Sequence, residues 1–129
     1  MRALVIDPDP DVRDLEALLL RRAGFDVEAV ADHRGVLASA VQGPFDVIVL
    51  DVRPGQDAGE SIRTLRLREG RPTPVVVVSA LARVRDEERA LAAGAAAYVV
   101  KPYSRQRLLE AVQGVVVRPA DTPALVRAA

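Results

Sequence analysis

The feature of this sequence that most constrains its fold is a set of short apolar runs that each end at, or next to, a polar or charged residue. The clearest runs are residues 3–7, 45–50 and 75–78, and the last of them is four consecutive valines. Nearly continuous apolar runs are typical of strands that are covered on both faces of a sheet. Helix-length segments separate the runs, so the sequence predicts parallel strands joined by right-handed crossovers.

The whole chain divides into five expected strands and five expected helices. The strands are expected at residues 3–7, 25–30, 45–50, 75–78 and 97–100. The helices are expected at residues 10–23, 33–42, 59–69, 84–93 and 105–112. Asp9, Asp32 and Ser104 are suitable N-cap residues for three of them. This alternation predicts a flavodoxin-like, doubly wound α/β fold with a five-stranded parallel sheet in the order 2-1-3-4-5.

Length and composition favour a single small soluble domain. We expect the domain to span residues 1–117, followed by a tail at residues 118–129 that holds Pro119 and Pro123. The 18 basic and 18 acidic residues give no net charge, which does not favour direct nucleic-acid binding. There is no cysteine, and no apolar run approaches the roughly 20 residues that cross a membrane. We therefore expect a cytoplasmic protein without disulfides or membrane contact.

Four chemically distinctive residues stand at the carboxyl ends of the expected strands. They are Asp7, Asp51, Ser79 and Lys101. In open parallel sheets, ligands bind outside this edge. A carboxylate can attack phosphorus as a nucleophile, while a hydroxyl, an ammonium group and a divalent cation can neutralise the phosphoryl oxygens. The set therefore predicts a pocket for phosphoryl transfer to a carboxylate.

Lys101 has additional support, because it is the only lysine in a chain with 17 arginines. A sequence that uses arginine for ordinary charge is expected to keep one lysine where a compact ammonium group is needed. Taken one at a time, the four residues have simpler interpretations, as loop acids, a turn serine and a surface lysine. Their joint order along the chain favours the functional interpretation.

The chain resembles the receiver domain of two-component response regulators over about residues 1–117. The resemblance is carried by ALVIDPDPDVRDL, FDVIVLDVRPG, TPVVVVSA and GAAAYVVKPYS. It implies that Asp51 is the phosphoacceptor and that Ser79 is the switch hydroxyl, which contacts the phosphoryl group. It also implies that Lys101 is the lysine common to the family.

Further positions follow from the same resemblance. Pro102 matches the family's usual cis proline, which would aim the preceding lysine into the site. Tyr98 matches the switch aromatic residue, which changes rotamer as the hydroxyl moves. Asp7, Asp51 and the backbone carbonyl at Arg53 match the groups that hold Mg²⁺.

One departure from the family pattern removes an expected metal ligand. Pro8 stands where the family usually has a second acid, and proline offers no ligand side chain. Asp9 is one place further on, but we expect it to cap the first helix. A charge pair at about 4 Å is worth about 4 kcal/mol at an effective dielectric of about 20, so we expect weak Mg²⁺ binding.

A second departure lies in the loop after Asp51. Pro54 follows that aspartate by three residues, whereas the family's proline usually follows by four. The resemblance therefore does not fix the path of this loop or the carbonyl ligand at Arg53. We consider two interpretations of the Arg53 side chain, a solvated loop arginine and a cation that partly replaces the charge of the metal.

The resemblance implies a phosphoacceptor that is served by a sensor histidine kinase or a phosphotransfer protein. Phosphorylation would change a surface on the fourth helix, fifth strand and fifth helix that binds a downstream effector protein. No enzyme activity is expected beyond self-catalysed phosphoryl transfer and autodephosphorylation. One alternative, favoured by Pro8, is an interaction module of the same fold that does not depend on phosphorylation. Another is a haloacid-dehalogenase-like phosphatase, suggested by Asp7 and Asp9, although no acidic pair follows Lys101.

Overall fold

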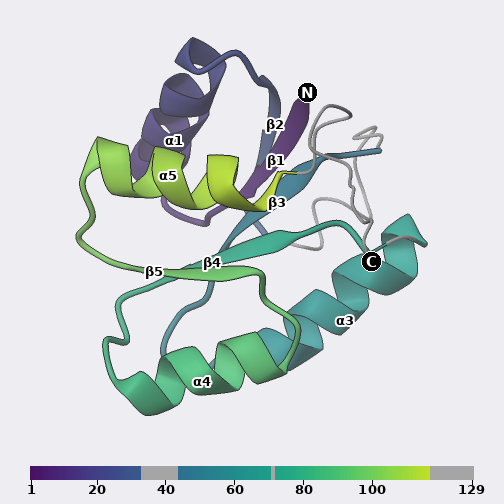
Figure 1. Ribbon diagram of the computed structural model, residues 1–129, viewed down its shortest axis with the longest axis vertical. Coiled ribbons are helices and arrows are strands. Elements are labelled where there is room, and N and C mark those ends of the chain that lie inside the picture. The colour runs from purple at the N-terminus through teal and green to yellow at the C-terminus, as the bar shows by residue number, and fades with distance from the viewer. Residues whose placement is uncertain (33–43, 71, 117–129) are drawn as a thin grey trace, which may run out of the picture.

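The computed structural model describes residues 1–32, 44–70 and 72–116 (Figure 1). Its five parallel strands form one sheet in the order β2-β1-β3-β4-β5. The strands are β1 (Arg2–Ile6), β2 (Asp26–Val30), β3 (Val47–Asp51), β4 (Val75–Ser79) and β5 (Ala97–Val100). The helices in the described residues are α1 (Pro10–Arg22), α3 (Ala58–Glu69), α4 (Val84–Ala92) and α5 (Arg105–Val115). The predicted sheet and strand order are confirmed. Four of the five predicted helices are found, and the other, at residues 33–42, lies outside the described residues.

Among the described residues, α1 and α5 cover one face of the sheet, and α3 and α4 cover the other (Figure 1). The valines of β4 show how this arrangement uses an apolar run. Val76 and Val78 belong to the core on the α1 and α5 side, whereas Val75 and Val77 belong to the core on the α3 and α4 side. All four are at most 1% exposed. Burial of one such side chain contributes about 1.5–3 kcal/mol, so both helical layers stabilise this strand.

α1 forms where the sequence predicts it, but only two of its four leucines are buried. Leu15 and Leu18 are 51% and 44% exposed. The buried side chains include Glu16 and Leu20, which lie one helical turn apart on the same face. A glutamate therefore enters the core on this side of the sheet.

Polar caps begin the two helices that follow β1 and β5. The Asp9 carboxylate accepts hydrogen bonds from the backbone N–H groups of Asp11 (3.0 Å) and Val12 (3.4 Å), directly before α1. The Ser104 hydroxyl accepts one from the Arg107 N–H (3.0 Å), directly before α5. These caps satisfy N–H groups that a helix leaves free at its start. The predicted N-cap residues Asp9 and Ser104 are confirmed.

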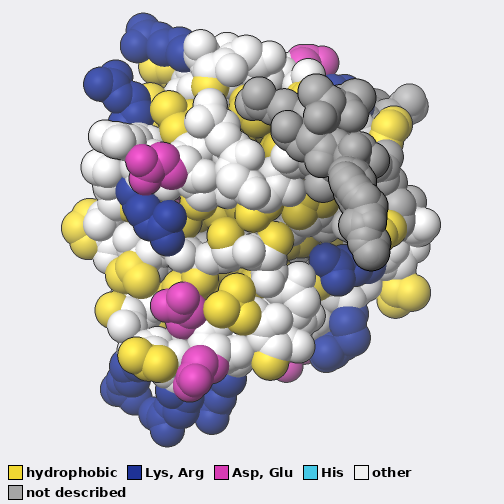
Figure 2. Space-filling model, viewed as in Figure 1, with side chains coloured by type: hydrophobic (Ala, Val, Ile, Leu, Met, Phe, Trp, Pro, Cys, Tyr) yellow, Lys and Arg dark blue, Asp and Glu magenta, His cyan; other side chains and the backbone are white. Residues whose placement is uncertain are grey.

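The face that carries α4, β5 and α5 is turned towards the viewer in Figure 1. In the same view, hydrophobic side chains gather across the middle of this face, between α5 and α4 (Figure 2). No helix in the described residues is long and apolar enough to cross a membrane. The expected tail at residues 118–129 lies outside the described residues.

Candidate functional site

The structure brings together three of the four residues that the strand ends predict. Asp51 is the last residue of β3, Asp7 directly follows β1, and Lys101 directly follows β5. The Lys101 ammonium group donates a hydrogen bond to Asp51 Oδ1 at 2.6 Å and another to Asp7 Oδ2 at 3.4 Å. Ser79, the last residue of β4, is on the strand next to Asp51, whose register partner is Val78. The carboxyl edge of the sheet therefore carries all four residues, and three of them are in contact.

Both oxygens of Asp51 face a cation. Lys101 binds Oδ1, and the Arg53 Nε lies 3.6 Å from Oδ2. The Asp51 side chain is only 5% exposed, whereas that of Arg53 is 54% exposed. Beside them is a cavity of about 260 Å³ whose lining includes Pro8 and Ser61. A water molecule occupies about 30 Å³ of the liquid, so this cavity has room for a phosphoryl group.

Asp7 is fully buried, and both of its carboxylate oxygens are engaged. Oδ1 accepts a hydrogen bond from the Asp9 N–H at 2.9 Å, and Oδ2 accepts the one from Lys101. Burial raises the pKa of Asp7, although the hydrogen bond from Asp9 opposes this shift. Asp7 therefore serves as a buried partner of Lys101 in this structure.

The charge of Lys101 is stabilised by the acids around it. Burial by itself lowers the pKa of this ammonium group. The hydrogen bond and negative charge of Asp51, together with the charge of Asp7, outweigh burial, so the pKa of Lys101 is raised. The site thus holds a fixed positive charge directly on the candidate acceptor carboxylate.

Ser79 and Tyr98 are joined through one intervening residue. The Ser79 hydroxyl accepts a hydrogen bond from the Leu81 N–H at 3.1 Å, and the Tyr98 hydroxyl donates one to the Leu81 carbonyl at 2.7 Å. Ser79 is 1% exposed and Tyr98 7% exposed. Any movement of the Leu81 backbone therefore changes both hydrogen bonds.

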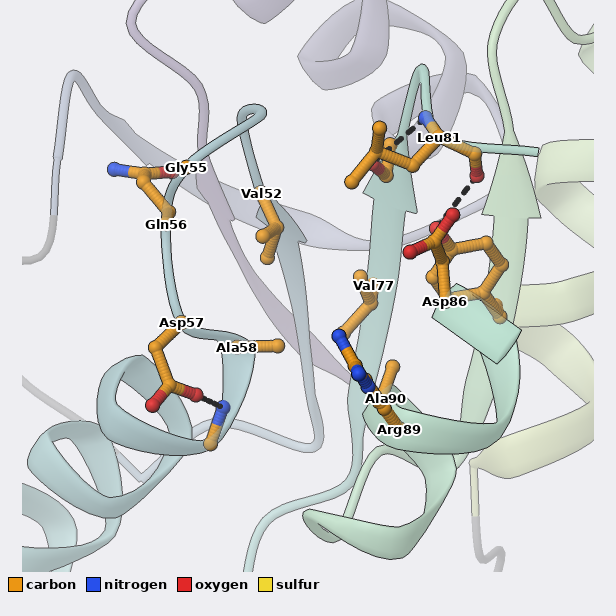
Figure 3. Close-up of a pocket in the computed structure, with 13 residues that line it drawn as sticks. Val52, Gly55, Gln56, Asp57, Ala58, Val77, Leu81, Asp86, Arg89 and Ala90 are labelled. Carbon is orange, nitrogen blue, oxygen red and sulfur yellow. Dashed lines mark hydrogen bonds between the residues drawn. The ribbon is translucent and has the colours of Figure 1, made fainter. Parts of the chain in front are cut away.

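A larger cavity of about 460 Å³ lies beside these hydrogen bonds (Figure 3). On one side is the loop of Gly55 and Gln56, and on the other is α4, which contributes Asp86 and Arg89. The cavity adjoins Ser79 and Tyr98, while the Asp51 side chain does not line it. It leaves space next to the residues that the resemblance identifies as the switch.

The peptide bond between Lys101 and Pro102 is cis, as the resemblance implies. Lys101 occupies this bend directly after β5, and its side chain reaches Asp51 and Asp7. The cis peptide bond expected before Pro102 is therefore present, and its role in the switch stays a prediction.

The groups expected to hold Mg²⁺ do not form a complete ligand set. Pro8 supplies no ligand, and the Asp9 carboxylate caps α1 instead. The Arg53 carbonyl accepts a hydrogen bond from the Gln56 N–H at 3.0 Å. Within residues 1–32, 44–70 and 72–116, no three His, Cys, Asp or Glu side chains are grouped so as to hold a metal. Magnesium usually keeps several waters and is bound through one or two carboxylates, and Asp7 and Asp51 are the two that the expected set supplies.

One buried pair near the site, Glu16 and Tyr103, was not among the residues that the sequence predicts. Glu16, on α1, is 1% exposed and accepts a hydrogen bond from the hydroxyl of Tyr103, which is 87 residues away along the chain. Burial raises the pKa of Glu16 to about 7, although the hydrogen bond from Tyr103 opposes the shift. The sequence feature that indicates this burial is the position of Glu16, one helical turn before the apolar Leu20 on α1.

Comparisons with known proteins agree with the fold. The family model of the response regulator receiver domain matches residues 3–113. The chain is 32% identical over 124 residues to the DNA-binding response regulator MtrA of Mycolicibacterium smegmatis, covering 95% of this chain and 54% of MtrA. The chain spans about half the length of the curated relatives that it matches.

Comparisons with solved structures also identify response regulators and receiver domains as similar to this chain. The chemotaxis response regulator CheY4 of Vibrio cholerae is 30% identical, with a TM-score of 0.77 and coverage of 89% of this chain and 98% of that one. The receiver domain of sensor histidine kinase PA1611 of Pseudomonas aeruginosa PAO1 is 30% identical, with a TM-score of 0.72 and coverage of 88% and 95%. That structure holds a magnesium ion coordinated in its active site cleft. The matched family model and the shared fold together show that this chain belongs to the response regulator receiver domain family.

Proposed function

We propose that this receiver domain accepts a phosphoryl group on Asp51 from a sensor histidine kinase or a phosphotransfer protein. The observation that supports this most strongly is the contact of Lys101 with Asp51 at 2.6 Å and with Asp7 at 3.4 Å. These contacts hold the Lys101 ammonium group beside Asp51, which borders a cavity of about 260 Å³. A preorganised cation lowers the energy of the negative charge that develops during phosphoryl transfer.

Three residues carry the chemistry in this proposal. Asp51 is the nucleophile, Lys101 binds a phosphoryl oxygen, and the Ser79 hydroxyl turns from Leu81 to bind another. The domain acts on itself, so its chemistry is limited to its own phosphorylation and autodephosphorylation. No turnover of an external phosphate ester is part of the proposal.

The switch follows from the hydrogen bonds of Leu81. When the Ser79 hydroxyl turns towards the phosphoryl group, its bond to the Leu81 N–H is lost, and the loop that also binds Tyr98 moves. Tyr98 is part of β5 and therefore connects this loop with the face formed by α4, β5 and α5; hydrophobic side chains gather on this face (Figure 2). Phosphorylation shifts the population of two arrangements of this face, which binds a downstream effector protein.

We also propose that Mg²⁺ binds weakly. Asp7 and Asp51 are the only carboxylates offered by the expected ligand set, and each is already in contact with Lys101. The absence of an acid at Pro8 removes one charge pair, worth about 4 kcal/mol at an effective dielectric of about 20. Titration calorimetry is expected to give a dissociation constant above about 1 mM, weaker than about 4 kcal/mol of binding free energy.

The proposed domain spans residues 1–117, with residues 118–129 as a tail, and acts in the cytoplasm. It contacts neither a membrane nor nucleic acid directly, in keeping with a net charge of zero. MtrA is described as DNA-binding, and about half of it matches this chain. Nucleic-acid contact in this family is therefore proposed to belong to parts of a regulator outside the receiver domain.

The test is intact-mass measurement after incubation with acetyl phosphate and Mg²⁺. The wild-type protein is expected to gain the mass of one phosphoryl group, and Asp51→Asn is expected to gain none. A wild-type protein that stays unmodified would leave a phosphorylation-independent interaction module as the better explanation. Equal modification of both proteins would place the acceptor elsewhere.

A further inference from the structure

Arg53 lies at the place where a counter-charge for the phosphoryl group is needed. Its Nε is 3.6 Å from Asp51 Oδ2, the oxygen that Lys101 does not bind. Arg53, Asp51 and Pro8 line the same cavity of about 260 Å³. The guanidinium group is half-exposed, so it can adjust to a ligand that enters from solvent.

The backbone of Arg53 is held while its side chain remains adjustable. The Arg53 N–H donates a hydrogen bond to Gln56 Oε1 at 2.8 Å, and its carbonyl accepts one from the Gln56 N–H at 3.0 Å. This turn engages the carbonyl that the family resemblance assigns to the metal. It also fixes the backbone position from which the Arg53 side chain extends towards Asp51.

The charges at the site balance without a metal ion. Asp7 and Asp51 contribute two negative charges, and Lys101 and Arg53 contribute two positive charges. Phosphorylation replaces the single charge of Asp51 by about two charges on the phosphoryl group. The site then carries about one net negative charge with Arg53, and about two without it.

We propose that Arg53 binds the transferred phosphoryl group and allows Asp51 to be phosphorylated without a divalent metal ion. This inference rests on the proposed function of Asp51 as phosphoacceptor. A guanidinium group presents paired N–H donors that match two oxygens of a phosphate, and it stays charged at any pH of interest. Arg53 thus takes over the charge neutralisation that the incomplete metal site does not supply.

An acyl phosphate is a suitable donor for this step. Asp51 Oδ2 attacks phosphorus and forms the new P–O bond, while the bond from phosphorus to the donor's bridging oxygen breaks. The electron pair of the broken bond leaves with the donor's carboxylate, so no proton, metal or oxidant is consumed. Lys101 and Arg53 face the phosphoryl oxygens from the two sides of the Asp51 carboxylate.

The experiment measures the rate of phosphorylation by acetyl phosphate with intact-mass detection, once with Mg²⁺ and once with excess EDTA. The variants are Arg53→Ala, Arg53→Lys and a matched control, Arg22→Ala. Arg22 is exposed in the last turn of α1, at the end remote from Asp7. Circular dichroism checks that each variant is folded.

In EDTA, the wild-type protein and Arg22→Ala are expected to be phosphorylated at rates close to those with Mg²⁺. Arg53→Ala is expected to lose about a hundredfold in EDTA, the effect of removing one preorganised donor from a developing negative charge. Arg53→Lys is expected to recover part of this loss because it keeps the positive charge.

Two results overturn the inference while leaving the proposed function intact. One is phosphorylation of the wild-type protein that occurs only with Mg²⁺. The other is phosphorylation in EDTA that Arg53→Ala does not slow relative to Arg22→Ala. Absence of phosphorylation under both conditions would instead contradict the proposed function, and the inference with it.

Discussion

The buried carboxyl group of Glu16 is expected to make the stability of this protein depend on pH. Burial raises its pKa from 4.5 to about 7, and the hydrogen bond from Tyr103 opposes the shift only in part. The native state therefore binds this proton more tightly than the unfolded state does. The contribution of Glu16 to the free energy of unfolding is complete below about pH 4.5 and is lost as the pH rises through about 7.

The size of the effect follows from the same shift. One pKa unit corresponds to about 1.4 kcal/mol, so the rise in the pKa of Glu16 corresponds to about 3 kcal/mol. Most of this contribution to the unfolding free energy, about 2–3 kcal/mol, is lost between about pH 5 and pH 8. The perturbation is Glu16→Gln, which cannot ionise but still offers an oxygen to the hydroxyl of Tyr103.

Urea unfolding followed by far-UV circular dichroism measures the difference. Between about pH 5 and pH 8, the wild-type protein is expected to lose about 2–3 kcal/mol of unfolding free energy relative to Glu16→Gln. Glu88→Gln, a matched change at an exposed position on α4, is expected to follow the wild type. Parallel pH profiles for the wild type and Glu16→Gln would refute the reasoning.

Three further predictions concern the site and its surroundings. Pro8→Asp restores an acid beside Asp7 and is expected to raise Mg²⁺ affinity at least about tenfold in titration calorimetry, because one charge pair is worth several kcal/mol; an unchanged affinity would contradict the account of the metal site. Asp9→Ala removes the cap of α1 and is expected to lower the unfolding free energy by about 1 kcal/mol while leaving Mg²⁺ affinity unchanged. A clear fall in that affinity would make Asp9 a metal ligand. Tyr98→Phe removes the hydrogen bond to the Leu81 carbonyl and is expected to lower the unfolding free energy by about 1 kcal/mol in urea titrations; equal stability would mean that this bond is not important in solution.

The sheet and the position of the site could be predicted because their signals are local. Four consecutive valines between helical segments are typical of a strand with both faces covered. The carboxyl ends of parallel strands share one edge, so Asp51 and Lys101 are brought together once the strand order is known. The cap at Asp9 was predictable for the same reason, since it depends on residues that follow it directly.

Features that depend on distant contacts could not be predicted. Leu15 and Leu18 are exposed although they are apolar, and the packing of α1 against the sheet and α5 buries a face that contains Glu16. The partner that makes this burial tolerable, Tyr103, is 87 residues away. When a helix has apolar residues on more than one face, its contacts with the rest of the fold decide which face is buried.

The direction of the Arg53 side chain is a second feature of this kind. The sequence allowed both a solvated arginine and a cation near Asp51, because a loop arginine has many rotamers. The turn with Gln56 fixes its backbone, and the guanidinium group lies beside the carboxylate while remaining half-exposed.

The proposed phosphoryl transfer depends above all on Asp51 as the residue that accepts the phosphoryl group. Borohydride reduction of an aspartyl phosphate yields homoserine, which peptide mass spectrometry can locate in the chain. After treatment of the wild-type protein with acetyl phosphate, we predict homoserine at position 51. Homoserine at another aspartate, or none in a protein that has gained the mass of a phosphoryl group, would contradict the account.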